Sequence, residues 1–551
     1  VGSIDVSEYS RFNRNFQEVN YDLLGEFKGL NLGDKLKFNG LLGANIRKQS
    51  ISSIRAKTNG GLSIPRVYSL TNSKNSIEAP VEREEDIEVD GVFGQAGLVF
   101  DGWAILDLAA RRDQSSTLPA GNNIYYYPSA SMGIIFSKFL GEGDAFTFGK
   151  LRLNYAEVGN TAPWGSVLDV YDLGTAFGDA GTATVAPTKN NPDLKPERTK
   201  SYEAGLELRF LKDMLGFDIT YYNMKTIDQI LPAAVSRATG YTSKFINAGE
   251  IENKGWEVQM FLRPVNTPNF KWRMDLNWAR NRNKVIKLDG DLQNLQLSSH
   301  QGGVTINAAV GEPYGTIKGN NFVYYDENGN GERDPGENQK VLRLFGAGYG
   351  YRSSATSDEI IGNINPDWTG GVNNTFHVGN LLSFSFLIDV KKGGDLFSLD
   401  QYYGLATGES VATAGLNDLG NEVRAPISEG GGIIVEGVLP DGTPNTNRYE
   451  ATDFGIYGYR RNPNAAFVYD AGFVKLREAT LNFHFPSKMF GASNTVKGAT
   501  IGIYGRNLWI IHKNLPYADP EDGMSAGNVQ GYQVGSYPTA RTFGINLNVK
   551  F

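Results

Sequence analysis

The spacing between candidate strands is the feature that most restricts what this chain can fold into. Short links occur near residues 29–34, 101–102, 140–145, 211–213, 264–269, 379–380 and 486–496. Between them lie long polar segments at about 47–91, 113–123, 159–199, 226–251, 282–366, 392–471 and 509–540. Two short links, Asp101-Gly102 and Gly379-Asn380, are dipeptides that suit two-residue hairpin turns. Short turns at one end and long loops at the other are typical of outer-membrane β-barrels, whose short turns face the periplasm.

The segments that these links separate show period-two alternation. In residues 201–210 every even position is apolar, from Tyr202 to Phe210, and every odd position is Ser, Glu, Gly or Arg. The same pattern recurs in residues 215–221, 270–278 and 382–390. Each such strand has one apolar and one polar face. Period two alone does not separate a soluble sandwich from a membrane barrel, but the Greek-key connections of a sandwich give no reason for short and long links to alternate.

Counting on this scheme predicts about fifteen strands, the first near residues 17–28 and the last at 541–551, both running toward the short turns. We therefore expect an all-β fold, a transmembrane antiparallel β-barrel with long extracellular loops and short periplasmic turns. Plugged barrels have about 22 strands. Residues 1–551 are accordingly expected to be the C-terminal part of such a barrel, with the plug domain and about seven leading strands absent. Residues 1–10 show neither the charged start nor the apolar core of a signal peptide.

The alternation also predicts which side chains meet lipid. Phe217, Ile219, Leu276 and Phe384 are expected to face the bilayer, and Asp218 and Asn277 the interior. Five tryptophans near strand ends or on outward faces are expected mainly to form aromatic girdles: Trp256, Trp272, Trp278, Trp368 and Trp509. The last strand alternates as far as Phe551, and a final aromatic residue resembles the assembly signal of outer-membrane barrels. An edge strand of a soluble domain is the alternative.

Composition excludes several classes of function. The net charge is -7 and no basic block occurs, so nucleic-acid binding is not expected. The chain has no cysteine, which excludes disulfides, thiolate metal sites and a cysteine nucleophile. The common hydrolase and phosphate-binding motifs are absent, and the four histidines, His300, His377, His484 and His512, are scattered. We expect no catalytic residues. A barrel-embedded hydrolase would need acidic and His side chains gathered at the rim.

Several motifs carry a family resemblance. Residues 191–210, NPDLKPERTKSYEAGLELRF, look like the most recognisable segment of TonB-dependent receptors, where a loop ends and a strand re-enters the barrel. Further segments agree in order: NAGEIENKGWEVQ at 247–259, IGNINPDWTGGVNNTF at 361–376, FVKLREATLNF at 473–483, GRNLW at 505–509 with ADPE at 518–521, and YPTARTF at 537–543. The chain thus resembles the C-terminal barrel portion of SusC/RagA family TonB-linked outer-membrane proteins, most specifically from Asn191 onward.

That resemblance implies a multi-pass barrel in the outer membrane of a Gram-negative bacterium. It implies uptake of oligomeric nutrients, glycans or peptides, gated by a plug and powered by the TonB complex through the absent N-terminal part. A SusD-like lipoprotein would act as the lid. The alternative is a non-transporting barrel that serves as a surface scaffold or adhesin. No residue can be nominated for substrate binding.

One loop has the spacing of a calcium site. In DENGNGERDPGE the residues at positions 1, 3, 5, 7, 9 and 12 are Asp326, Asn328, Asn330, Glu332, Asp334 and Glu337, with Gly331 at position 6. Alternate oxygen ligands and a glycine at the sharp turn are the pattern of a calcium loop. The preceding FVYY is strand-like, so EF-hand helices are not indicated. We predict a weak, structural Ca²⁺ site here, with an Asn-Gly-rich hairpin tip as the alternative.

Overall fold

The computed structural model describes residues 7–140, 143–290, 292–345, 348–451, 456–491, 495–524, 530–535 and 537–551. Parts of two predicted short links, 141–142 and 492–494, lie outside these described residues. So do residues 1–6 and parts of three predicted long loops, at 291, 346–347, 452–455, 525–529 and 536.

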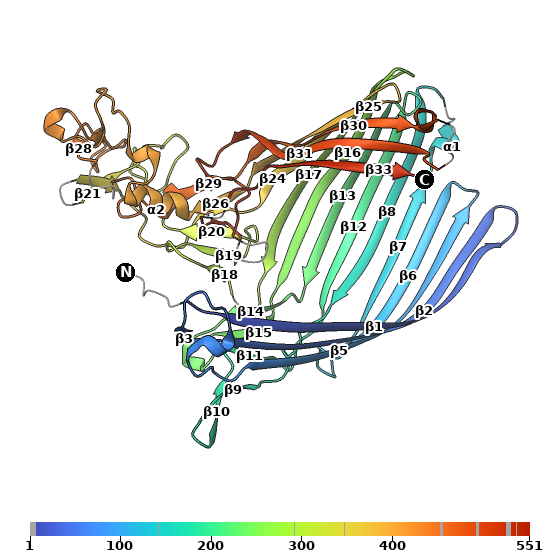
Figure 1. Ribbon diagram of the computed structural model, residues 1–551, viewed down its shortest axis with the longest axis horizontal. Coiled ribbons are helices and arrows are strands. Elements are labelled where there is room, and N and C mark those ends of the chain that lie inside the picture. The colour runs from blue at the N-terminus through green and yellow to red at the C-terminus, as the bar shows by residue number, and fades with distance from the viewer. Residues whose placement is uncertain are drawn as a thin grey trace.

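A single curved antiparallel sheet of 15 strands forms the wall of the molecule (Figure 1). Its strands are β1 (Ser10–Asn31), β2 (Leu36–Lys57), β5 (Val81–Phe100), β6 (Ala104–Ser115), β7 (Ile124–Ile134), β8 (Phe146–Asn160), β12 (Glu197–Phe210), β13 (Leu215–Ile227), β16 (Glu250–Asn266), β17 (Phe270–Lys287), β24 (Pro366–Val378), β25 (Leu382–Gly393), β30 (Phe473–Pro486), β31 (Gly498–Lys513) and β33 (Thr542–Lys550). Strand order follows chain order, so every neighbouring pair is an up-and-down hairpin. The predicted fold class and strand number are confirmed.

The predicted short links are the turns at one end of the wall. In the first dipeptide turn Asp101 and Gly102 have φ of 46° and 66°, and Gly379 of the second has φ of 55°, as such turns require. Helix α1 (Ser137–Leu140) and the 3₁₀ turn η7 (Ser487–Phe490) lie in two other links. The carboxy terminus lies at this same end, and the long loops lie at the opposite end (Figure 1).

One predicted loop is much shorter in the structure. Residues 47–91 were expected to be mostly irregular, yet β2 and β5 stay paired residue for residue as far as Arg55 and Val81. The apolar alternation stops near residue 47, but a ladder of backbone hydrogen bonds does not need apolar side chains. Cross-strand charges also support the extension, because Lys48 Nζ lies 3.4 Å from a carboxylate oxygen of Glu88.

The long loops carry small sheets and short helices. Their strands are β3 (Asn59–Leu62), β4 (Ser73–Asn75), β9 (Tyr171–Phe177), β10 (Ala180–Val185), β11 (Thr188–Lys189), β14 (Ile230–Ala234), β15 (Ser243–Asn247), β18 (Asn294–Ser299), β19 (Thr305–Ala309), β20 (Thr316–Gly319), β21 (Leu342–Phe345), β22 (Gly348–Tyr351), β23 (Glu359–Asn363), β26 (Asp395–Ser398), β27 (Ile433–Ile434), β28 (Arg448–Tyr449), β29 (Val468–Asp470) and β32 (Tyr532–Gln533). Helical turns are η1 (Leu70–Asn72), η2 (Arg237–Thr239), α2 (Leu399–Thr407), η3 (Val411–Thr413), η4 (Ile427–Glu429) and η6 (Asn464–Phe467). Within the described ranges, no helix combines the length and apolar character needed to span a membrane.

The strand register separates two faces of the wall. Glu207, Asp218, Gln259 and Asn277 lie opposite one another across four successive strands and share a face. The register puts all four residues that were predicted to meet lipid on the other face, where the rings of Phe376 and Phe384 stack with centroids 6.3 Å apart. The predicted division into a polar and an apolar face is therefore present.

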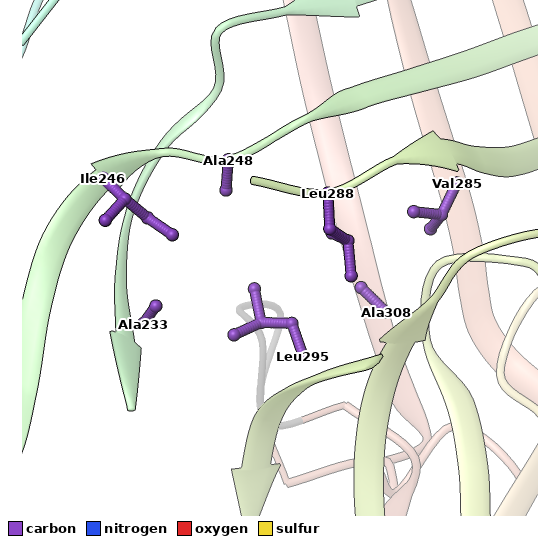
Figure 2. Packing of buried hydrophobic residues seen from close by; sticks show 7 residues of the cluster. All are labelled: Ala233, Ile246, Ala248, Val285, Leu288, Leu295 and Ala308. Carbon is purple, nitrogen blue, oxygen red and sulfur yellow. The ribbon is translucent and has the colours of Figure 1, made fainter. Parts of the chain in front are cut away.

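Burial is distributed unlike that of a soluble protein. The largest fully buried apolar side chains are Leu194, Val285, Val304, Ile306, Ile317, Leu342, Phe397, Phe467, Leu515 and Tyr532. All lie in long loops except Val285, near the loop end of β17. Figure 2 shows one such cluster, in which Ile246 and Ala233 of the β14–β15 hairpin face Leu288 and Leu295. The apolar face of the wall is uncovered instead: Leu42 is 66 % exposed and Ile503 is 50 % exposed. An uncovered apolar band of this kind needs lipid.

Candidate functional site

Three long loops at the end of the wall opposite the short turns form one structural unit (Figure 1). We call residues 288–365, 394–472 and 514–541 the loop assembly. Its central core takes Val304, Ile306 and Ile317 from the first segment, Phe397, Leu399 and Phe467 from the second, and Tyr532 from the third. A shared core of this kind means that the described parts of the three loops are folded against one another.

Hydrogen bonds reinforce that core. Strand β26 pairs in parallel with β32 and antiparallel with β29, so the second and third segments share a small sheet. The Tyr532 hydroxyl donates to the Val304 carbonyl at 2.6 Å, which joins the third segment to the first. Buried polar groups whose hydrogen bonds are all formed favour a single arrangement of the surrounding core.

A buried charge network fastens the third segment to the wall. Lys475 of β30, whose side chain is 3 % exposed, donates to Asp519 at 2.6 Å and to Glu521 at 2.5 Å. Arg477, also on β30, donates to Glu521 and to Asp389 of β25. Burial opposes ionisation of both carboxyls. It is outweighed at Asp519 by hydrogen bonds from Lys475 and Thr539, and at Glu521 by those from Arg477 and Lys475, so the pKa of each carboxyl is lowered. The network needs both charges of each pair to stay in place.

Several cavities occur at this end of the molecule. One, of about 370 Å³, lies where the wall meets the loop assembly and is lined by Asp389 and Lys391 of β25 together with Glu521 and Gly531 of the third segment. The second, of about 660 Å³, lies wholly within the loop assembly beside α2, and its lining includes Asp400. A further hollow of about 350 Å³ lies against β12–β17, where the polar face contributes Glu207, Arg273 and Asp275 among others.

The six residues of the predicted calcium loop are brought together in one turn. Asp326 accepts the backbone N–H groups of Gly329, Asn330 and Gly331, and the Gly331 bond is 2.7 Å long. Glu337 accepts those of Glu327 and Asp334. Tyr324 and Lys340 close the turn as an antiparallel bridge, and no helix flanks it, as expected.

The side-chain oxygens of that turn are engaged with each other's amides. Asp334 Oδ2 accepts from the side-chain amides of Asn328 and Asn330 at 2.6 and 2.8 Å. Within the ranges that the structure describes, no three His, Asp or Glu side chains gather in a way that could hold a metal. To bind Ca²⁺ both asparagines must turn their amides and present carbonyl oxygens, and Glu332 would contribute its carbonyl. Calcium binding stays a prediction.

Sequence reasoning did not find the residues around the larger cavity. Asp400, Tyr403 and Glu409 come from one stretch of the second segment, and Tyr517 comes from the third. The only local signal was the run DQYYG at 400–404, a carboxylate followed by two adjacent aromatic residues inside a long loop. Nothing in that run indicates that Tyr517, more than a hundred residues away, completes the site.

Comparison with known proteins places the chain among receptors. Residues 3–339 match the family described as TonB dependent receptor-like, beta-barrel. TonB-dependent receptor P3 of Formosa agariphila is 28 % identical over 493 residues, which are 85 % of this chain and 46 % of that protein. Receptor P26 of the same organism is 27 % identical over 545 residues, 94 % of this chain and 52 % of that protein. TonB-dependent receptor SusC of Bacteroides thetaiotaomicron is 24 % identical over 473 residues, 80 % of this chain and 41 % of that protein. The chain thus spans about half the length of these relatives.

Among solved structures, that of the RagAB peptide transporter has a similar fold. Its TM-score is 0.75 at 18 % identity, and the match covers 98 % of this chain and 56 % of that one. The relatives are receptors and transporters, in agreement with the expectation that the chain is not an enzyme.

Proposed function

The chain belongs to the TonB-dependent receptor-like β-barrel family, whose members are multi-pass proteins of the outer membrane, and on that premise we propose that it forms the wall and loop portion of a nutrient importer. The imported compounds are glycan or peptide oligomers. A plug and about seven further strands, supplied by a longer chain, complete the barrel and connect it to TonB. A SusD-like lipoprotein covers the loop assembly.

The cavity between wall and loops carries this proposal. Asp389 and Lys391, which line it, lie on the polar face of β25, the same face as Asn277 by register through Gly371. Glu521 and Gly531 line it from the loop assembly. Charged groups of the inner wall and of the loop assembly therefore meet at one cavity, and a polar inner face is what a water-soluble oligomer needs in order to pass from outside into a barrel.

The length of the loops supports a lipoprotein partner. Links between elements usually have about 4–6 residues, and much longer links that are ordered commonly serve as binding loops or lids. The two longest links here run between β17 and β24 and between β25 and β30, and they contain much of the loop assembly. SusC of Bacteroides thetaiotaomicron is similar to this chain in sequence, and the RagAB peptide transporter is similar to it in fold.

A projecting hairpin favours a second candidate function, that of a surface scaffold. Strands β9 and β10 extend away from the wall (Figure 1), with Leu173 89 % exposed and Phe177 85 % exposed. An isolated two-stranded hairpin is marginally stable by itself, so a partner surface would stabilise it. A scaffold would bind such a partner without energised uptake.

Energised uptake separates these candidates. Cells that carry the intact protein should accumulate a fluorescently labelled nutrient oligomer, and collapse of the proton gradient by a protonophore should abolish the accumulation. Equal labelling with and without the gradient would indicate a scaffold instead.

A deletion in the loops tests the lipoprotein partner in the same cells. Replacement of residues 411–461 by a short Gly-Ser linker leaves β26 and η6 in place. That variant should insert normally but lose lipoprotein co-purification, and unchanged co-purification would contradict the partner proposal.

A further inference from the structure

We propose that the cavity beside α2 is a subsite for a basic side chain, the ammonium or guanidinium group of a peptide substrate. This inference rests on the proposed import function, because it names the class of oligomer that the loop assembly receives. The cavity measures about 660 Å³, which is within the usual range of small-ligand pockets. Residues from all three segments of the loop assembly contribute to its lining, namely Gln301, Asp400 and Tyr517 among others.

The charged side chains that line the cavity are both acidic. Its described lining includes the carboxylates of Asp400 and Glu409 and contains no Lys, Arg or His. Neither carboxylate forms an ion pair with any residue that the structure describes. Such a surface attracts a cation and repels an anion.

The position of Glu409 makes the charge pattern harder to explain by local stability. Helix α2 ends at Thr407, with Gly408 as its C-cap, so Glu409 follows the negative end of the helix. A carboxylate there is unfavourable, whereas Asp400 in the first turn is favoured by the same dipole. Arg424 donates to the Gly408 carbonyl at 2.7 Å and so offsets the helix end, which leaves Glu409 and Asp400 as the negative groups that line the cavity. A cation that binds there would be stabilised by both.

Aromatic side chains at the cavity suit the same ligand. Tyr403 is 42 % exposed and Tyr517 is 63 % exposed, and both line the space. Ammonium and guanidinium groups bind to the faces of such rings. The backbone of Tyr517 also has φ of 62°, a left-handed conformation that a bulky residue adopts only where surrounding structure imposes it. The surroundings of Tyr517 therefore set its backbone, and its exposed side chain lines the cavity.

Buried groups fix the carboxylate of Asp400. The fully buried Gln533 donates its amide to Asp400, and Ser398 donates to the Gln533 carbonyl oxygen at 2.6 Å. Ser398 also accepts the backbone N–H of Gln401, which caps α2. Because the chain from Ser398 to Asp400 is held at both ends, the carboxylate is placed before a ligand arrives. Preorganised acceptors of this kind lower the entropy cost of binding.

Titration of the intact protein with tri-lysine, followed by calorimetry, tests the subsite. Glu409→Gln should weaken tri-lysine binding about fivefold, the effect of one partly exposed ion pair. Adding Asp400→Asn should bring the loss to about twentyfold, since the two changes act on separate carboxylates. Tyr517→Leu should weaken binding about threefold through loss of the ring face. Glu429→Gln is the matched control, because Glu429 is an exposed glutamate of the same segment that does not line the cavity.

Three outcomes would overturn the proposal. They are equal affinity for tri-lysine and tri-glutamate, equal losses in Glu409→Gln and Glu429→Gln, and binding of maltotriose that Tyr517→Leu weakens and Glu409→Gln does not. A measurement of energised uptake in the same preparation of cells distinguishes a failure of the subsite proposal from a failure of the importer proposal. If uptake persists while tri-lysine fails to bind, the subsite is wrong and the importer stands. If energised uptake is absent, the importer is wrong whatever tri-lysine does.

Discussion

The wall and the loop assembly differ in where their apolar side chains lie, exposed on the wall and buried in the loop assembly. In the wall, Leu42 and Ile503 keep their side chains uncovered, while the loop assembly buries Phe397 and Tyr532 completely. The wall is built from local hairpins between neighbouring strands, whereas the assembly joins segments far apart in the chain. The wall therefore depends on lipid for its apolar face, and the assembly is folded much as a small soluble domain would be. The two regions should respond differently to the same kind of substitution.

The largest expected effect is on the loop core. Phe397→Ala removes a fully buried ring and should destabilise the loop assembly by about 4 kcal/mol, the usual cost of a large cavity in a core. Limited proteolysis of the detergent-solubilised protein should then cut within 394–472, while the heat-dependent gel shift of the barrel stays unchanged. Leu416→Ala, at a 66 % exposed position, is the control. Simultaneous loss of the gel shift would show that the two regions are not separable.

The next effect concerns the junction between the two regions. Lys475→Met leaves Asp519 without its buried cation and Glu521 with Arg477 alone, and it should cost about 3 kcal/mol. Hydrogen exchange should increase in residues 514–541 and not in β25. The pKa of both carboxyls is lower in the folded protein, so the stabilisation is present above their ordinary pKa values and is lost as the pH falls through the folded values. Acid should therefore release this segment, and protection factors of residues 514–541 that do not fall with pH, after correction for the intrinsic exchange rate, would contradict the network.

A smaller loss of stability is expected from an arginine on the apolar face of the wall, and almost none from an arginine on the polar face. Ile219→Arg should cost about 2–3 kcal/mol in bilayers, because the residue is predicted to meet lipid. Asn277→Arg, on the polar face, should be mild. Asp218, an interior position that the sequence also suggested, is a poor control, since Arg152 donates to it at 2.5 Å and a second arginine would repel the first. Unfolding in lipid vesicles measures both costs, and equal costs would contradict the assignment of faces.

The smallest effect is expected at the calcium loop. We predict weak Ca²⁺ binding, with Kd about 10⁻⁴–10⁻³ M, that Asp326→Ala abolishes without altering the wall. Backbone N–H bonds, foremost from Gly331, lower the pKa of Asp326, so acid should disrupt the turn only when the pH falls below the usual value for Asp. Calorimetry with Ca²⁺ at neutral pH measures binding, and Asp358→Ala, outside the turn, is the control. Identical titrations of the intact protein and Asp326→Ala would leave the hairpin tip as the interpretation.

Much of the wall could be predicted because its strands pair with their neighbours in the sequence and can be recognised from local patterns. Period-two alternation and link length identified the strands, and β12 and β13 begin and end close to the expected residues, whereas β17 begins as expected and extends to Lys287, into the expected loop. The extension of β2 and β5 was missed, because polar residues there leave only the backbone ladder as evidence. Around the site, the sequence indicated which segments are long and nothing about how they pack.

What the sequence by itself determined is therefore the barrel architecture and the polarity of its two faces, since each hairpin forms between neighbouring strands and each strand repeats every two residues. Only the tertiary structure decided where the loop segments meet. The bond between Ser398 and Gln533 joins residues 135 positions apart, and the one between Lys475 and Asp519 joins residues 44 apart. No periodicity relates such pairs, because irregular loops have no repeating geometry, and burial in a shared core selects their partners.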